Sequence, residues 1–497
     1  MTSTSPTEPS ATPPRLRRWL VRTGFLLACL ATLIAALYLE EKIRGRAAWR
    51  AYETESKARG VKLDFADYIP PQIPDAENFA SIPIFDEAFR ATAVHQPVPD
   101  PFFLNEPGGS ERPYLNNPEM GERTDLVAWQ KYLASKGLLS DMSADAAADV
   151  LRALDRFAVP LAQLHEAGTR PGCRFPVHWE QGFAALLPHL GLLNEAARFY
   201  FLRASAHLAR GESAAAYEDF HDGLRLATAT RGEPSLIVGL VRGSMASMME
   251  NAVWGGLAGH QWAEPELRKI DADLATLDWL QEYFFAMGSE RAATNLLSDM
   301  LIENPGLLAQ LAPELARDSG FHGQGAWAFR LHPTGWFYDC KVRSNRLIDE
   351  MLARFDPVQR RWLPTRALPS LPENIKGLPE KVHYMLFALM TPIYAQVEQG
   401  FIKAVTETDR TRLACALERF RLARGTLPAT LAELTPDFLA ALPVEILNGE
   451  SYHYRREPDG SFVLYSVGPD LRDDGGITDP RHPVTQRHDW IWRYPAP

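Results

Sequence analysis

The chain has 497 residues, a formal net charge of −10 and an ordinary globular composition, with 46% hydrophobic and 23% charged residues. This length exceeds what one compact core usually holds, so two or three units are expected. The acidic balance argues against a nucleic-acid-binding protein, which usually presents a basic face. Four cysteines without a Cys-x-x-Cys pair exclude a zinc ribbon and a thioredoxin-type motif, so we expect buried free thiols.

The N-terminal residues predict a membrane anchor. Residues 1–18 begin with a Ser/Thr/Pro-rich stretch that cannot build a core, and we expect them to be a disordered cytoplasmic tail. The stretch from Thr23 to Leu39 carries no charge, and Trp19 and Tyr38 stand near its ends. A transmembrane helix is therefore predicted over 19–39. A juxtamembrane helix is expected to follow and to end at Gly60.

Two other interpretations of this apolar stretch are less well supported. A cleaved signal peptide needs small residues at its cleavage site, where Leu33 and Ile34 stand. A lipidated Cys29 would normally be followed by polar residues, but apolar ones follow it. Basic residues flank the stretch in equal numbers, while Glu40 and Glu41 adjoin its C-terminal end. We therefore expect an uncleaved single-pass anchor with the N-terminus in the cytoplasm and the bulk of the chain outside it.

The segment from 40 to 122 is predicted to contain the juxtamembrane helix and then a proline-rich wrapper. Its proline density forbids long helices and central strands over 61–122. The same segment carries many apolar side chains that need burial: Phe79, Ile82, Ile84, Phe85, Phe89, Phe102 and Phe103. We expect it to lie in extended form over a helical body.

Residues 123–355 are predicted to form that body. Apolar residues recur at three- and four-residue steps, and Ser143 is the expected N-cap of one helix. The stretch 194–231 predicts two helices joined at Gly211, an arrangement that resembles a tetratricopeptide unit. Three clean copies of the repeat are absent from the sequence, so we expect a degenerate array of helical hairpins. Further helices are predicted at 235–259, 263–287, 289–302 and 341–355.

The C-terminal part is predicted to be a small α+β module behind a proline-rich connector at 356–379. Within the module at 380–497 we expect helices at 380–405 and 409–425, then a β-hairpin. Two alternating runs flank "PDG" in "SYHYRREPDGSFVLYSVG", which is a strong hairpin signal. The predicted fold class is therefore mainly α, with an N-terminal transmembrane helix.

The sequence contains no recognisable catalytic motif, because its histidines lack metal-site spacing and no nucleophile elbow or phosphate loop is present. Two short clusters contain residue types found in sites: Cys173, His178 and Glu180 in one, and His332, Trp336, Tyr338, Asp339 and Cys340 in the other. For the first, chance proximity is favoured over a metal site. For the second, an aromatic turn entering a helix is favoured over a Cys–His nucleophile.

The acidic loop "LYSVGPDLRDDGG" is the best candidate for chemistry. Asp470, Asp473 and Asp474, with two following glycines, provide the oxygen ligands and the backbone freedom that Ca²⁺ requires. The alternative is that the aspartates only form successive turns. We name these three aspartates as a candidate calcium site and expect no other cofactor.

The run from "RLACALERFRLARG" to "LYSVGPDLRDDGG" resembles the C-terminal module of type II secretion major pseudopilins. In both, a helix ends at a glycine and is followed by a proline segment, a hairpin and a "Y-S-x-G-x-D" loop. The resemblance implies calcium binding by Asp470, Asp473 and Asp474. It does not extend to the "LPVEIL" segment, where the family has an aspartate and a tryptophan, and about 370 residues have no pseudopilin counterpart.

Over nearly its whole length the chain is also similar to a family of bacterial membrane-anchored envelope proteins. The anchor, "AWRAYETESKARGVKLDFADYIPP", "PDAENFA" and "ACALERFRLARG" carry this resemblance. It implies an inner-membrane protein whose bulk is periplasmic and it implies no particular activity. We expect a non-catalytic role in protein–protein interaction or scaffolding, with membrane lipid and proteins as partners. The alternatives are an envelope hydrolase with an unrecognised site and a component associated with a secretion system.

Overall fold

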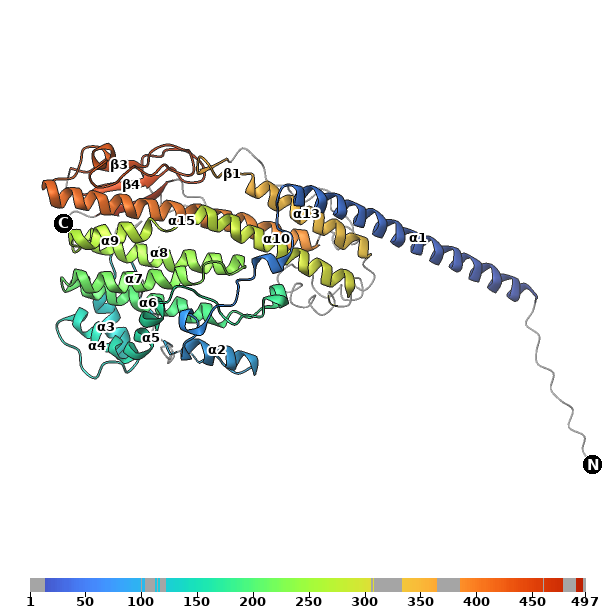
Figure 1. Ribbon diagram of the computed structural model, residues 1–497, viewed down its shortest axis with the longest axis horizontal. Coiled ribbons are helices and arrows are strands. Elements are labelled where there is room, and N and C mark those ends of the chain that lie inside the picture. Colours follow the sequence, from blue (N-terminus) through green and yellow to red (C-terminus); the bar gives the residue numbers. More distant parts are fainter. Residues whose placement is uncertain are drawn as a thin grey trace, which may run out of the picture. The chain divides into compact units, whose positions relative to one another are not determined.

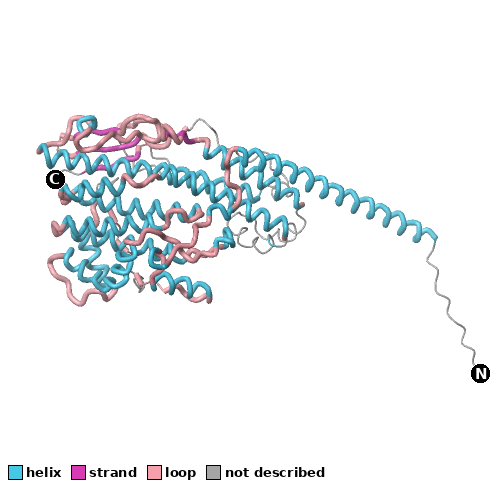
Figure 2. Tube along the Cα trace, in the orientation of Figure 1, coloured by secondary structure: helices cyan, strands magenta, loops and turns pink. Residues whose placement is uncertain are grey.

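The computed structural model describes residues 14–99, 101–102, 112–113, 115–116, 122–304, 307, 333–363, 385–458, 460–476 and 489–494. The described chain is mainly helical, with short strands near the C-terminus (Figure 2), which confirms this part of the predicted fold class. It divides into two compact units, each built from several segments. Unit 1 comprises Met1–Leu63, Thr294–Arg346 and Ser370–Met390, and unit 2 comprises Asp64–Ala293, Leu347–Pro369 and Thr391–Pro497.

Helix α1 (Pro14–Ala58) contains both the apolar stretch and the predicted juxtamembrane helix, without a break between them (Figure 1). It is long and apolar enough to cross a membrane, and none of its most apolar window is buried inside the protein. At ~1.5 Å per residue, a helix of 45 residues measures about 68 Å, roughly twice a bilayer's hydrocarbon core. The helix therefore extends well beyond any membrane that its apolar part spans. As predicted, it ends just before Gly60, which adopts a φ of 76°.

Unit 1 is held together by contacts of the second half of α1 with α13 (Thr334–Leu352). Tyr52, Leu63 and Val342 form a buried cluster. Asn295, from α10 (Trp279–Glu303), donates to the Leu63 carbonyl at 3.1 Å and accepts from Asn345 at 2.6 Å. Apolar packing and buried amides thus join three segments that are far apart in sequence.

Unit 2 begins with the described part of the proline-rich segment. It forms two single-turn helices, η1 (Phe65–Tyr68) and η2 (Asp75–Glu77), and then α2 (Pro83–Ala93), which starts at a proline as helices often do. Phe79, Phe85 and Phe175 pack together, with 4.9 Å between the ring centroids of the last two. Phe79, Ile82, Phe85 and Phe102 are buried as expected, Ile84 and Phe89 are half-buried, and Phe103 lies outside the described residues. The segment is not extended throughout as predicted, because α2 lies within it.

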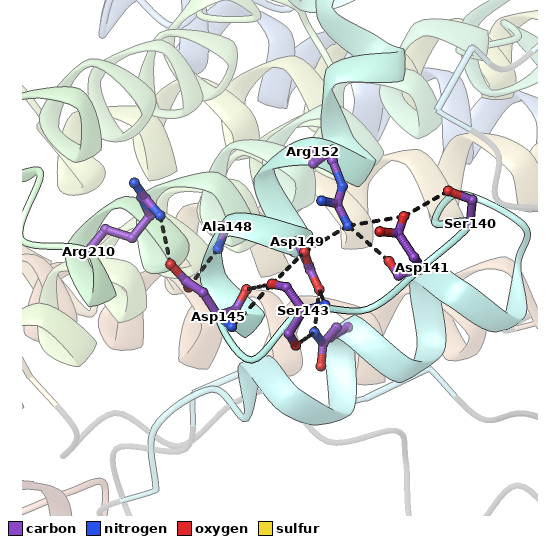
Figure 3. A network of polar contacts seen from close by, with 9 residues as sticks. Ser140, Asp141, Ser143, Asp145, Ala148, Asp149, Arg152 and Arg210 are labelled. Atoms are coloured by element: carbon purple, nitrogen blue, oxygen red, sulfur yellow. Dashed lines mark hydrogen bonds and ion pairs between the residues drawn. The ribbon is translucent and has the colours of Figure 1, made fainter.

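The predicted N-cap at Ser143 is wrong. This residue lies in the turn between α3 (Leu126–Ser135) and α4 (Ala146–Leu154). Asp145, not Ser143, caps α4 by accepting from the Ala148 amide at 2.9 Å. Ser143 instead donates its hydroxyl at 3.0 Å to Asp149, which is fully buried and also accepts from Gln130 (Figure 3). Helix α4 therefore begins two residues later than predicted, because Ser143 is used to satisfy a buried carboxylate.

The centre of unit 2 is a stack of helices. α5 (Ala158–Gly168) precedes α6 (Pro188–Ala209), α7 (Ser213–Ala229), α8 (Leu236–Ala258) and α9 (Glu264–Leu274). The predicted hairpin is confirmed: α6 and α7 pack side by side and turn at Gly211, whose φ is 75°. Helix α8 packs against both, and a Cβ on Gly223 of α7 would overlap the Met249 sulfur of α8. Small residues therefore permit close helix contacts in this stack.

Two predicted helix boundaries are wrong. A break was predicted at residue 288, but α10 continues through it. The chain turns before Trp279 instead, where the Asp278 carboxylate accepts from the Gln281 amide at 3.2 Å and caps the start of α10. Helix α15 (Met385–Arg424) likewise continues through residues 406–408. There the Thr406 hydroxyl donates to the Ile402 carbonyl at 3.0 Å, within the same helix. A threonine inside a helix can bond to the carbonyl one turn earlier, so it does not by itself end the helix.

The C-terminal part of unit 2 contains the predicted hairpin. Strands β3 (His453–Arg456) and β4 (Phe462–Ser466) are antiparallel, and β5 (Trp490–Tyr494) extends the sheet in the order β3-β4-β5. The single-turn helix η5 (Leu431–Leu434) precedes them. A second hairpin, β1 (Phe355–Asp356) with β2 (Arg361–Trp362), opens the segment predicted as a connector. Residues 364–384 of that segment lie outside the described residues.

The buried Glu290 of α10 should make stability depend on pH. Burial raises the pKa of Glu290 to about 7, although its carboxylate accepts a hydrogen bond from the Leu236 amide at the start of α8. Since a Glu in the unfolded chain titrates near ~4.3, this group favours the folded state fully only below that pH, and its contribution is lost as the pH rises through 7. Glu290→Gln should therefore stabilise the protein by about 3–4 kcal/mol at pH well above 7, relative to its effect near pH 4.

Denaturant unfolding of the full chain in detergent, repeated across this pH range, measures the effect. Glu303→Gln, at an exposed position of the same helix, is the matched control. Parallel pH profiles for wild type and Glu290→Gln would show that the buried carboxyl does not titrate in this range.

Candidate functional site

A groove between α8 and α15 is the candidate functional site of unit 2. Its volume is about 210 Å³, well above the ~10–15 Å³ that one water requires. It is lined by Gly239, Leu240, Gly243, Ser244, Ser247, Trp279, Gly400, Phe401, Lys403, Ala404 and Glu407. Most of these residues are small, so the two helices leave room between them for an added side chain.

The glycines divide the groove into a closed end and an open middle. A Cβ on Gly239 would lie 2.9 Å from the Phe401 ring, so this end is filled by the protein's own side chain. A Cβ on Gly243, one turn along α8, would have no neighbour within 4 Å. The middle of the groove is therefore open because α8 has glycine there.

A chain of buried polar groups lies beside the groove. The indole of Trp279 donates to the Thr408 hydroxyl at 2.9 Å, and this hydroxyl in turn donates to Glu250. Glu250 and Thr408 are both nearly inaccessible to solvent. Glu407, which lines the groove, forms an ion pair at 3.5 Å with the exposed Lys403 one turn earlier.

The electrostatics favour a neutral Glu250. Burial raises the pKa of the Glu250 carboxyl well above its ordinary value, and the nearby charge of Glu407 raises it further. The hydrogen bond from Thr408 and the charge of Arg410 offset only part of this effect. A carboxyl with a strongly perturbed pKa beside a cleft is a recognised mark of a functional site. With the Lys403–Glu407 pair neutral overall, the groove is suited to polar and apolar contacts more than to holding a net charge.

The described histidines do not provide a catalytic base for this groove, since none of them lines it. Seven of the eight lie against carboxylates instead: His165 with Asp222, His178 with Glu180, His189 with Glu233, His207 with Glu212, His221 with Asp273, His260 with Glu418 and His453 with Asp473. These pairs occur throughout unit 2. Four of them, at His165, His189, His221 and His260, join residues more than forty positions apart and so connect separate elements of the fold.

The first sequence cluster separates into two environments. His178 pairs with Glu180 at 2.9 Å, but both side chains are largely exposed, with relative accessibilities of 74% and 69%. Cys173 is instead close to the charge of Glu233, whose partner is the buried His189. Burial and this charge both raise the pKa of the Cys173 thiol, which is the opposite of what an activated nucleophile requires.

The second sequence cluster lies within the first turns of α13, except that His332 is outside the described residues. The predicted turn is therefore wrong, because the helix predicted at 341–355 already begins at Thr334. Asp339 accepts from Arg343 at 2.7 Å. Cys340 is buried, and burial raises the pKa of its thiol to about 12. This thiol is therefore a packing group.

The acidic loop is ordered by hydrogen bonds to its own neighbours. Asp473 accepts from the Tyr465 hydroxyl at 3.0 Å and from the Gly475 amide at 2.8 Å. The Gly475 amide and the Tyr465 hydroxyl both favour the ionised form, so the pKa of Asp473 is lowered. The exposed Asp470 accepts from the amide of Arg472 at 3.1 Å, in a local turn. Each of these two aspartates therefore stabilises a turn, which is what the alternative interpretation requires.

Two acidic residues that sequence reasoning missed complete the loop. The buried Asp489 accepts from the amides of Gly476 at 2.7 Å and Asp474 at 3.4 Å. Glu445, in the segment where the resemblance to pseudopilins fails, is fully buried and accepts from the Val467 amide at 3.1 Å. Among the residues that the structure describes, no group of three or more His, Cys, Asp or Glu side chains is placed to hold a metal ion. Calcium binding by Asp470, Asp473 and Asp474 stays a prediction.

Searches of known protein families, of curated proteins and of solved structures found no match to this chain.

Calcium binding is tested by thermal melting of the full chain with Ca²⁺ and with a chelator. If the loop binds calcium, the wild-type melting temperature should rise with Ca²⁺, because a ligand that binds only the native state stabilises it. Asp473→Asn should abolish this rise, since the amide can still accept from Gly475 but carries no charge. Equal melting temperatures of the wild type with Ca²⁺ and with chelator would leave the loop as a turn.

Proposed function

We propose that the protein is a non-catalytic, single-pass membrane protein whose helical unit 2 binds a segment of another protein in the groove between α8 and α15. The observation that carries this proposal is the open middle of the groove at Gly243, where the protein leaves unfilled a space that one side chain would occupy. The groove is open to solvent at Leu240 and Lys403, so a segment of another protein can reach it.

The residues that line the groove are better suited to binding a peptide than to catalysing a reaction. Leu240 supplies an apolar wall, and the hydroxyls of Ser244 and Ser247 supply hydrogen-bonding groups. Ile237, one turn before on α8, is 61% exposed and extends the apolar surface. An apolar side chain that inserts at Gly243, with backbone groups bonding to the serines, would match this pattern.

The membrane part of the proposal rests on α1. Its apolar residues are exposed to an extent that water would not favour, and the helix has the length to span a bilayer. We propose that the membrane is the bacterial inner membrane, with the N-terminus in the cytoplasm and the bulk of the chain in the periplasm. A helical-hairpin body mounted on such an anchor is suited to scaffolding in the cell envelope.

The experiment is chemical cross-linking with a membrane-impermeant reagent on spheroplasts, followed by purification of the full chain. Gly243→Leu fills the groove at a position without neighbours, and Gly191→Leu, at an equally open glycine of α6, is the matched control. Both changes should stabilise their helix by up to about 1 kcal/mol, because glycine is a poor helix former. We expect a reproducible cross-linked partner in the wild type and in Gly191→Leu, and its loss in Gly243→Leu.

Retention of the same partner in Gly243→Leu would overturn the groove as the binding site. Recovery of the partner only after the cells are lysed would contradict the proposed orientation while leaving the binding intact.

A further inference from the structure

A close helix contact in unit 1 lies just beyond the apolar stretch of α1. A Cβ on Gly335, in the first turn of α13, would overlap the backbone carbonyl of Glu41. A Cβ on Gly45 would lie 2.5 Å from the Gly335 carbonyl oxygen and 3.0 Å from the Cβ of Tyr338. The two backbones therefore touch at a pair of glycines, and neither position tolerates a side chain.

This contact fixes the level of α13 along α1. The uncharged stretch ends at Leu39, and α1 continues without a break, so each residue adds ~1.5 Å along the axis. Glu41 and Gly45 are therefore about 3 Å and 9 Å past the last apolar residue. The polar layer on each side of a bilayer is roughly 5–8 Å thick, from the difference between its total and hydrocarbon thickness. The first turn of α13 is at that level.

The direction of α13 supports this placement. After Gly335, Lys341 lies 3.9 Å from the ring centroid of Trp49, and Val342 packs against Tyr52. Later residues of α13 thus contact later residues of α1, so both helices leave the apolar stretch in the same direction. The N-terminal end of α13 is the end nearest to the membrane.

The residues at this end have the chemistry of a membrane interface. Trp336 and Tyr338 are amphipathic aromatic residues, which favour the headgroup layer, and both are only half-buried in the protein. Lys42 and Arg46 of α1 are exposed at the same level and can reach lipid phosphates. Trp336 and Tyr338 are therefore suited to contact with lipid.

We propose that the first turn of α13, with Trp336 and Tyr338, lies in the headgroup layer of the bilayer that α1 spans. This inference rests on the proposed membrane anchor and extends it from one helix to two. The glycine contact holds α13 against α1, and the aromatic residues attach unit 1 to the lipid surface. The protein is then fixed at the membrane by a spanning helix and by an adjacent helix end.

The test uses the full chain in nanodiscs, with lipids brominated on the acyl carbons nearest the headgroup, which quench the fluorescence of adjacent tryptophans. Trp336→Phe should lose a measurable share of the quenching seen in the wild type. Trp49→Phe is the matched control, because Trp49 is ten residues past Leu39, about 15 Å along the axis and beyond the headgroup layer. Its quenching should equal that of the wild type.

Adding Tyr338→Trp to Trp336→Phe should restore the lost quenching and show that the altered chain is still folded at this end. Equal quenching in the wild type and in Trp336→Phe, with the chain inserted in the nanodisc, would overturn the inference and leave the anchor intact. A chain that is removed from lipid by alkaline carbonate would overturn the anchor and the inference together.

Discussion

Helix α15 carries charged side chains into the interior of unit 2, and several of them bond to groups on other elements. Glu398 accepts from Arg354, just before β1, at 2.9 Å, and Arg410 donates to the Trp490 carbonyl of β5 at 2.7 Å. Arg419 donates to Glu264 of α9 at 3.1 Å. Removing one partner of a buried charge pair typically costs about 3–5 kcal/mol. The positions of the strands and of α9 are therefore determined by this one helix.

The candidate groove follows from the same constraint. α15 cannot approach the first half of α8 more closely, because Phe401 already fills the space left by Gly239. Further along, Glu250 of α8 is bonded to Thr408 of α15, which holds the two helices at a fixed separation. The space between these two contacts is the groove. A neutral Glu250 makes that arrangement compatible with a buried position, since an ionised carboxyl there would be costly.

The sequence predicted what depends on local chemistry. The β3–β4 hairpin was found from its turn residues, and the end of α1 from Gly60. The prediction was wrong at Ser143, whose hydroxyl bonds to the buried carboxylate of Asp149, six residues later, instead of to the helix backbone. Glu250 was not predicted as a site residue. It is the only charged residue between Arg242 and Glu264, and this lack of other charges could have indicated that the helix around it is buried. The partner that makes it significant, Thr408, is 158 residues away in sequence.

The fold of unit 2 depends on α15, because the strands and α9 are positioned by contacts with it. Hydrogen exchange of the full chain in nanodiscs, read peptide by peptide, tests it most directly, because amides exchange slowly where opening requires global unfolding. The slowest exchange in unit 2 should be found in peptides from 394–424, and α9 should exchange faster. Exchange in 394–424 as fast as in α9 would contradict this account, since an element on which the rest depends cannot open before its neighbours.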